Sequence, residues 1–168
     1  MVDVEADGPI PGEYSMISFG VVIVEPGLSR TFAAKLRPIS QRWVEEALAV
    51  SGLTREETET FDDPSKTMHL FRDWIKSESK GRSVFVSDNN GFDWQFINWY
   101  FWKFVGENPF GHSSMNLGSL YKGLEGDCFK NFKHLRITKH THDPLDDAKG
   151  NAEAMLAMIE QHGLKIKL

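Results

Sequence analysis

The sequence predicts one α/β domain built around a mixed sheet. Short apolar and β-branched runs fill the chain before Pro38, and helical patterns alternate with one further strand after it. The length of 168 residues suits a single domain with its own core, and the chain contains no internal repeat, low-complexity tract or linker. We therefore expect residues 1–168 to fold as one domain, with three antiparallel strands first and helices flanking the sheet.

Three strands are expected at the start of the chain. The first carries the alternating run that includes Asp3 and Glu5, and the turn "DGPIPG" follows it. The second covers residues 16–25, "MISFGVVIVE", and the third covers about 28–37, where Pro38 ends it. β-Branched runs separated by glycine and proline turns are typical of an antiparallel meander.

Helical patterns follow these strands. Ser40 as a capping residue and a final Gly52 bound the first helix, and Pro64 begins the second. A short strand, "SVFVSD", separates these two helices from the later ones. The expected helices cover residues 40–52, 64 to about 80, 92–106, a short piece at 117–124 within a glycine-rich stretch, and about 146–161.

The helix expected at 92–106 is rich in aromatic residues. A helix that covers one side of a sheet needs a single apolar stripe, whereas aromatic side chains here occur on nearly every face. Either the helix is deeply buried, or its outer face docks onto a second copy of the chain to form a homodimer. The eight aromatic residues are Phe92, Trp94, Phe96, Trp99, Tyr100, Phe101, Trp102 and Phe104.

Composition restricts the functional classes. The net charge of −5 argues against a protein that tracks along duplex nucleic acid, but it is compatible with binding of a short or end-bound strand. The single cysteine, Cys128, excludes an internal disulfide framework and a cysteine zinc cluster, and it favours a cytoplasmic location. No apolar run reaches the roughly 20 residues that span a bilayer, so no membrane partner is expected.

Acidic residues occur at three places that a sheet can bring together. Strand alternation places Asp3 and Glu5 on the same face of the opening strand. Asp93 lies just inside the aromatic helix, directly after a strand, and Asp147 lies in the last helix. Because ligands bind at strand ends in α/β sheets, we expect these four carboxylates to converge.

Convergence of four carboxylates requires cations. Without them, the carboxyl groups would have strongly raised pKa values. Oxygen ligands without cysteine favour Mg²⁺ or Mn²⁺ over Zn²⁺. Two such ions about 4 Å apart are a known device for hydrolysing a phosphodiester bond, in which one activates a water and the other stabilises the leaving oxygen. The acids therefore predict a site for two divalent ions.

Three motifs, in this order, carry a resemblance to a known family. They are Asp3-x-Glu5, Asn-x-x-Phe-Asp ending at Asp93, and a histidine, His142, that precedes Asp147 by five residues and is followed by Asp147-Ala. The sequence resembles the DEDD superfamily of 3′-to-5′ exonucleases, in its histidine-containing, DnaQ-like branch with a ribonuclease H-like fold. It is most similar to the compact oligoribonuclease and ribonuclease T types, and the match covers residues 3 to about 153.

The resemblance implies a role for each matching residue. Asp3, Glu5 and Asp147 would bind the ion that activates water, with Asp3 bridging to the second ion, and Asp93 would complete the site largely through bound water. His142 would accept the proton of the attacking water, which suits a side chain whose unperturbed pKa is about 6.5.

Two positions depart from the family pattern. Pro144 stands where a small residue is usual, which bears on movement of the histidine loop. The turn "ADG" after the first motif lacks the threonine that often precedes the glycine, which bears on the contact with the terminal nucleotide.

Three residues are rivals for the assigned roles. His140 is a rival of His142 at a different spacing. Asp146 and Asp143 are rivals of Asp147, and Asp146 lies about 100° around the helix from it.

A basic segment leads into the histidine loop. Residues 130–142, "KNFKHLRITKHTH", contain no acid. The segment is either a solvated loop that offsets nearby acids or a strip that grips the phosphates behind the scissile one. The residues considered for phosphate binding are Lys130, Lys133, Arg136 and Lys139. By analogy with the family, the residues considered for the terminal base are Gly8, Met16 and Phe92.

The combined expectation is a metal-dependent 3′-to-5′ exonuclease acting on the 3′ end of single-stranded RNA or DNA. RNA is preferred because the compact members that the chain resembles mostly act on RNA, but no residue decides between the two sugars. Two alternatives stay open: a 3′-to-5′ DNA exonuclease, and a non-catalytic nucleic-acid-binding module of the same fold. The direction of cleavage is implied by the resemblance alone.

Overall fold

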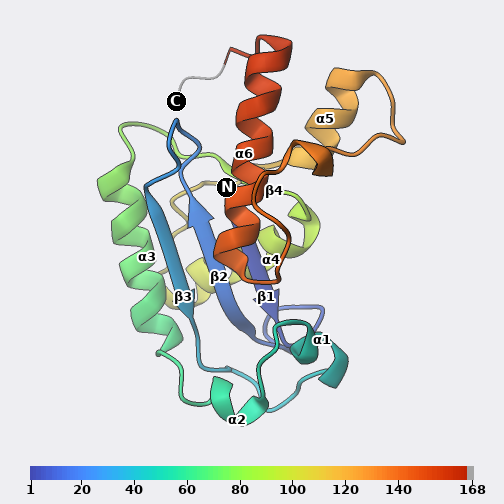
Figure 1. Ribbon diagram of the computed structural model, residues 1–168. Coiled ribbons are helices and arrows are strands. Elements are labelled where there is room, and N and C mark those ends of the chain that lie inside the picture. The colour runs from blue at the N-terminus through green and yellow to red at the C-terminus, as the bar shows by residue number, and fades with distance from the viewer. Residues whose placement is uncertain (166–168) are drawn as a thin grey trace.

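Helices cover both faces of a central sheet (Figure 1). The computed structural model describes residues 1–165. Helix α6 (Pro144–His162) packs on the first three strands, and α3 (Pro64–Glu78) and α4 (Asn90–Phe104) pack on the side of the sheet away from α6. Two groups of buried apolar side chains form the core, one beneath α3 and α4 and one beneath α6. The expected α/β architecture is confirmed.

The first three strands form the antiparallel meander that the sequence predicts. They are β1 (Val2–Ala6), β2 (Met16–Val22) and β3 (Thr31–Lys35), in the order β1-β2-β3. Every residue of β2 is buried, which agrees with its central position and its apolar sequence. The second and third strands are shorter than expected because the turn around Gly27 takes up the residues between them.

A parallel pair of strands lies beside β1. It consists of β4 (Phe85–Ser87) and β5 (Ser114–Asn116). The hydrogen bonds form two ladders, an antiparallel one of three strands and a parallel one of two, so both pairing types expected of the mixed sheet are present. β5 was not expected, because its sequence "SMN" has a single apolar residue and no strand pattern.

Capping residues mark where the longer helices begin. Asp63 caps α3 and Asp143 caps α6, and a proline occupies the first turn of each helix. The helix expected at 40–52 is shorter, and a short second helix follows it, where Thr54 and Glu57 form a capping box. No helix within residues 1–165 is long and apolar enough to cross a membrane. The remaining elements are α1 (Glu45–Val50), α2 (Arg55–Thr58), α5 (Leu117–Glu125) and the 3-10 turn η1 (Lys133–Leu135).

The aromatic side chains of α4 are largely buried within their own chain. Phe96, Tyr100 and Phe101 are fully buried, and the Tyr100 hydroxyl accepts a hydrogen bond from the Met16 amide of β2 at 2.8 Å. Of the eight aromatic side chains, only that of Trp102 belongs to the exposed class, at 49%. The structure therefore favours the buried-helix interpretation, and packing inside one chain accounts for most of the aromatic surface.

Candidate active site

Strand β1 presents two carboxylates on one face. Val2, Val4 and Ala6 are buried in the core, while Asp3 and Glu5 alternate with them and are only partly buried. The strand period of two therefore separates the apolar side chains from the acids, as the sequence predicts.

Helix α6 begins directly against β2, which brings a third carboxylate to β1. Gly20 of β2 pairs with Asp3, and a Cβ at Gly20 would lie 2.4 Å from the backbone nitrogen of Leu145. Only glycine allows so close an approach. Asp147 is 1% exposed, and one carboxylate oxygen from each of Asp3, Glu5 and Asp147 lies within 4.8 Å of the others.

Asp93 approaches β1 from the opposite layer. It lies in the first turn of α4, and its Oδ1 accepts a hydrogen bond from the Val4 amide of β1 at 3.2 Å. Its Oδ2 is buried and has no hydrogen-bond partner within residues 1–165. Burial raises the pKa of Asp93 to about 7. In the ionised carboxylate, Oδ2 would lack the hydrogen-bond partner that a buried charged oxygen needs.

Neighbouring carboxylates raise the pKa values of Asp3 and Glu5. Burial raises the pKa of Asp3 well above its usual range, and the neighbouring Asp93, Glu5 and Asp147 add to the effect. Burial and Asp147 likewise raise the pKa of Glu5 to about 7. An all-oxygen donor set with one orphaned buried oxygen fits hard divalent cations such as Mg²⁺ or Mn²⁺. The four residues therefore suit a metal site.

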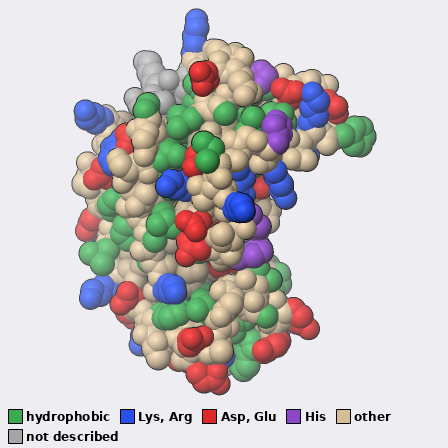
Figure 2. Space-filling model, in the orientation of Figure 1, with side chains coloured by type: hydrophobic (Ala, Val, Ile, Leu, Met, Phe, Trp, Pro, Cys, Tyr) green, Lys and Arg blue, Asp and Glu red, His purple; other side chains and the backbone are tan. Residues whose placement is uncertain are grey.

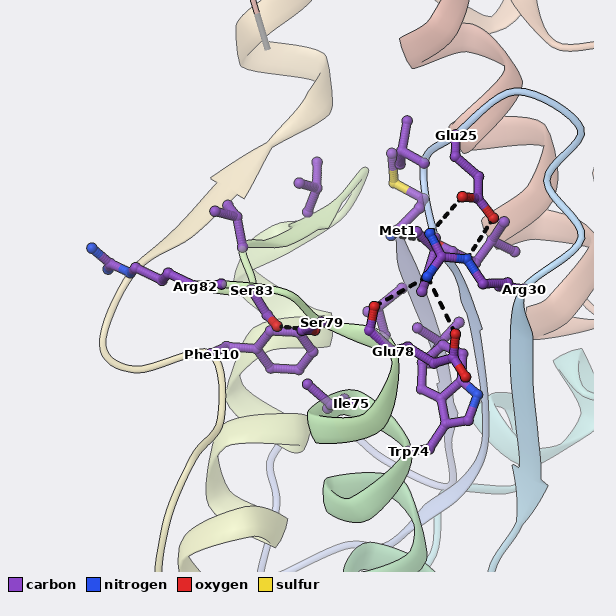
Figure 3. A pocket seen from close by; sticks show the side chains of 18 of the residues that line it. Met1, Glu25, Arg30, Trp74, Ile75, Glu78, Ser79, Arg82, Ser83 and Phe110 are labelled. Atoms are coloured by element: carbon purple, nitrogen blue, oxygen red, sulfur yellow. Dashed lines mark hydrogen bonds and ion pairs between the residues drawn. The ribbon is translucent and has the colours of Figure 1, made fainter. Parts of the chain in front are cut away.

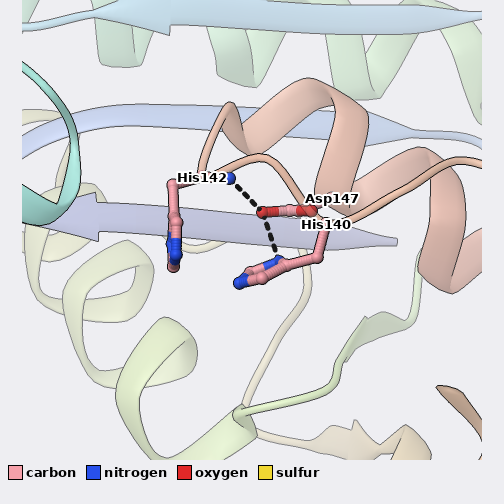
Figure 4. Close-up of side chains that lie close together, drawn as sticks. All are labelled: His140, His142 and Asp147. Carbon is pink, nitrogen blue, oxygen red and sulfur yellow. Dashed lines mark hydrogen bonds and ion pairs between the residues drawn. The ribbon is translucent and has the colours of Figure 1, made fainter.

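Four donors surround the carboxylate of Asp147. Its Oδ1 accepts hydrogen bonds from Arg136 Nη2 at 2.8 Å and from the Thr141 amide at 3.2 Å. Its Oδ2 accepts one from the His142 amide at 3.0 Å and lies 2.7 Å from His140 Nδ1 (Figure 4). Asp147 is therefore held in one orientation by the segment that precedes its own helix.

Two histidines lie over the acids. His142 adopts a left-handed backbone conformation with φ of 61°, and its Nδ1 is 3.8 Å from Glu5 Oε1. The rings of His140 and His142 have centroids 4.2 Å apart, and both side chains are about half exposed (Figure 4). Access to solvent and to the acids suits either ring for proton transfer. Geometry thus keeps His140 in view as a rival, although its Nδ1 faces Asp147.

The basic segment divides into exposed and buried positions. Lys133 and Lys139 are exposed, and Lys130 forms an ion pair with Glu125 at 2.6 Å. Figure 2 shows a hollow in the outline below the projecting α5 region, with histidine side chains along it. Arg136 differs, because its side chain is only 9% exposed and contacts Asp147. Arg136 is therefore placed differently from the lysines of its segment, because its guanidinium contacts a carboxylate inside the acid cluster.

The three residues considered for the terminal base lie in different surroundings. Met16 is fully buried in β2, so it offers no surface to a nucleotide, and that assignment is corrected. Gly8 is buried beneath Tyr14, whose ring would lie 2.1 Å from a Cβ at Gly8. Phe92 is partly exposed and packs against the core, which leaves it available for an apolar contact.

Sequence reasoning missed the contacts of Arg136 and His140 with Asp147. One signal was present: Gly150 stands in the middle of a helical pattern, where glycine is unfavourable unless something packs closely against it. A Cβ at Gly150 would lie 2.5 Å from Arg136 Nε. Gly20 carries the same signal within a strand.

A cavity of about 580 Å³ lies away from these acids (Figure 3). Met1, Val2 and Trp74 line it, and neither Asp3 nor Glu5 does so. The candidate site is therefore a cluster of carboxylates separate from this cavity.

Comparisons with known proteins identify the family of this chain. A model of an exonuclease family, RNase_T, matches residues 1–155. The chain is 38% identical over 178 residues to the 3′-5′ DNA exonuclease Cap18 of Escherichia coli, covering 99% of this chain and 94% of that protein.

Solved structures share the fold. The nuclease domain of 3′hExo, a DEDDh family member bound to rAMP, has a TM-score of 0.71 at 20% identity, covering 99% of this chain and 94% of that one. E. coli exonuclease I with a dT13 oligonucleotide has a TM-score of 0.72 at 13% identity, covering 96% of this chain and 40% of that one. Fold, motif order and family match agree, and the chain belongs to the RNase_T family of exonucleases with the fold of the DEDDh enzymes.

Proposed function

We propose that this exonuclease removes nucleotides stepwise from the 3′ end of single-stranded nucleic acid, with two Mg²⁺ or Mn²⁺ ions in its site. The observation that carries the proposal is that Asp3, Glu5 and Asp147 offer carboxylate oxygens within 4.8 Å of one another. Asp93 of α4 approaches the same strand, adds to the raised pKa of Asp3, and has one oxygen without a partner within residues 1–165. Such a cluster is tolerable only with cations present.

Each acid has a part in holding the ions. Asp3, Glu5 and Asp147 would hold one ion and Asp93 would complete the second site with Asp3, since Asp93 meets β1 from the other side. When bound, the ions supply activation of a water and stabilisation of the leaving oxygen. Arrangement on a strand and two helices keeps the carboxylates in place before substrate arrives.

His142 would accept the proton of the attacking water. Its ring stands at the edge of the acid cluster, 3.8 Å from Glu5, and is open to solvent through which the proton leaves. Exposed Lys133 and Lys139 would contact phosphates of the incoming strand, with Lys130 at the far end of the same segment. Phe92 and the Gly8 turn would meet the terminal nucleotide.

We propose DNA as the preferred substrate. The sequence-based expectation was RNA, taken from the compact enzymes that the chain resembles. The relative that shares 38% of its residues over nearly the full length is named a DNA exonuclease, and this long match has more weight than a resemblance in motifs. RNA remains the alternative that the experiment must separate, because a single contact with the 2′-hydroxyl determines the choice.

The experiment uses matched DNA and RNA oligonucleotides labelled at the 5′ end. With Mg²⁺ or Mn²⁺ we expect a ladder of products shortened from the 3′ end, faster on DNA, and no products with a chelator. Faster loss of RNA would return the assignment to RNA. Binding of both oligonucleotides without shortening in any metal would instead identify a non-catalytic binding module.

A homodimer and a cytoplasmic location stay proposals. Trp102 is the exposed aromatic residue of α4 and is the natural centre of an interface between two copies. Light scattering at several concentrations tests this assembly, and a monomer throughout would end it.

A further inference from the structure

We propose that Arg136 is a positioning residue that orients the carboxylate of Asp147 for metal binding, instead of gripping substrate phosphates. This inference rests on the proposed function, because it assigns Arg136 to the same site. Nothing in the sequence separated Arg136 from the lysines of its segment, and only its tertiary contacts set it apart.

The contact between Arg136 and Asp147 is buried on both sides. The Arg136 side chain is 9% exposed and that of Asp147 is 1% exposed, and Nη2 lies 2.8 Å from Oδ1. The same Nη2 also reaches the Asp147 backbone carbonyl at 3.4 Å. A charge-assisted hydrogen bond with restricted access to water fixes orientation far better than a surface pair does.

Gly150 of helix α6 leaves space for the guanidinium of Arg136, because glycine has no side chain. A Cβ at Gly150 would lie 2.5 Å from Arg136 Nε, 2.8 Å from Nη2 and 2.8 Å from the backbone carbonyl of Thr138, so any larger residue would displace the guanidinium and the backbone that carries it. Glycine weakens a helix interior relative to alanine. Its presence three residues after Asp147 is explained by the space that Arg136 occupies.

A second residue of α6 holds the backbone that carries Arg136. Glu153 accepts hydrogen bonds from the amides of Ile137 at 2.8 Å and Thr138 at 2.6 Å, and from the Thr138 hydroxyl at 2.9 Å. Asp147, Gly150 and Glu153 thus form one ridge along α6 against which residues 136–138 are fixed. A mobile phosphate-binding strip would not be tied down in this way.

Positioning has a chemical consequence. The hydrogen bonds from Arg136 and the Thr141 amide fix Oδ1 and prevent the carboxyl group from rotating away from Asp3 and Glu5, which keeps Asp147 oriented toward the place where a cation would bind. Lys133 and Lys139, by contrast, are exposed and free to meet phosphates. The two roles predict different kinetic signatures.

The test uses two variants that keep the positive charge and disturb only the geometry. Arg136→Lys shortens the side chain and removes the planar guanidinium. Gly150→Ala leaves Arg136 unchanged in sequence, but its new Cβ would displace the guanidinium. Two matched controls accompany them. Gly123→Ala changes a glycine of α5 that has open space around its Cα, and Lys133→Gln removes an expected phosphate contact.

Two readouts are measured on full-length, folded protein checked by circular dichroism. The first is the Mn²⁺ concentration that gives half of the maximal thermal stabilisation without substrate. The second is the pair kcat and KM on a DNA oligonucleotide at several salt concentrations. For Arg136→Lys and Gly150→Ala we expect a roughly tenfold higher Mn²⁺ midpoint and a roughly tenfold lower kcat, with KM and its salt dependence unchanged. Gly123→Ala should match the wild type.

The opposite pattern overturns the inference. If Arg136→Lys and Gly150→Ala leave the Mn²⁺ midpoint unchanged and raise KM with a weaker salt dependence, as expected for Lys133→Gln, then Arg136 contacts phosphate. Should one variant fail to fold, the other still decides. If the wild type shortens no oligonucleotide, the proposed function is wrong. The Mn²⁺ midpoint then still tests whether Arg136 orients Asp147 for metal binding.

Discussion

Two of the places where an arginine lies among carboxylates have opposite electrostatic results. Arg30 forms ion pairs with Glu25 and Glu78 beside the cavity, and its side chain is 39% exposed (Figure 3). Arg136 meets Asp147 inside the acid cluster and is 9% exposed. The residue types are the same, and only their number and burial differ.

The pKa values show what that difference means. The hydrogen bond from Arg30 lowers the pKa of Glu25 and so favours the ionised form of its carboxyl group. In the acid cluster, burial raises the pKa values of Glu5 and Asp93 to about 7 despite the presence of an arginine. One arginine balances two half-exposed carboxylates, but it leaves four buried ones with an excess of negative charge. The second place therefore needs further cations, and the first does not.

The largest loss of activity is expected from Asp147→Asn, which removes one negative charge from the acid cluster. We expect exonuclease activity to fall by about a hundredfold or more, because several kcal/mol of transition-state stabilisation depend on the ions. The rate on a labelled oligonucleotide measures it. Asp146 is the adjacent residue on the same helix and is exposed, so Asp146→Asn is the matched control and should retain activity. A fully active Asp147→Asn variant would refute the site.

His142→Ala should lower kcat by about a hundredfold or more, the range for loss of a general base. The protein should keep its thermal stabilisation by Mn²⁺, since His142 supplies no proposed metal ligand. His140→Ala is measured in parallel, because His140 Nδ1 also lies at Asp147. A larger loss of kcat in His140→Ala than in His142→Ala would transfer the role of base to His140.

A pH effect on stability should separate the two arginine environments. In the acid cluster, Glu5 and Asp93 have folded-state pKa values near 7, above their model values of 4.5 and 3.8. Between those values the folded state binds more protons than the unfolded state, so stability falls as pH rises. With a chelator, the midpoint of thermal unfolding should drop by roughly 5–10 °C from pH 6 to pH 8, because each of the two groups contributes about 1.3 kcal/mol over that interval.

Mn²⁺ should abolish most of that drop, because a cation replaces the protons. Asp93→Asn removes one titrating group and should flatten the dependence on pH in the chelated protein. An unfolding midpoint that rises with pH in the chelated wild type would mean that the acids are already neutralised by protein groups, and the case for metal would weaken.

The smallest effect is expected from Arg30→Gln. Loss of these solvent-exposed ion pairs should lower the thermal unfolding midpoint only slightly, because such pairs contribute little to folding stability. Exonuclease activity should stay at the wild-type value, because the cavity beside Arg30 is not lined by Asp3 or Glu5. Thermal unfolding and the oligonucleotide assay measure both quantities, and reduced activity would show that the cavity and the acid cluster are coupled.

Local patterns made much of the fold predictable. Alternation in β1 separates Asp3 and Glu5 from the apolar side chains, and Asp143 with its following proline marks the start of α6. The position of β5 was not predictable, since its three residues have little strand character and are ordered by pairing with β4. Burial of Met16 was likewise hidden, because an apolar residue after a turn reads the same whether it is covered or not.

Taken alone, the amino-acid sequence determined which acids face the same side of a strand, which residues cap the helices, and the order of the three motifs. These features depend on residue periodicity and on neighbours within a few residues, and this information is present in the local sequence. The tertiary structure determined which segments pack against Gly20 and Gly150. It also determined that Arg136 and His140 contact Asp147, whereas the Lys133 side chain is exposed to solvent. Those contacts join side chains to distant turns and strands, and their distances are set by how helix and sheet pack.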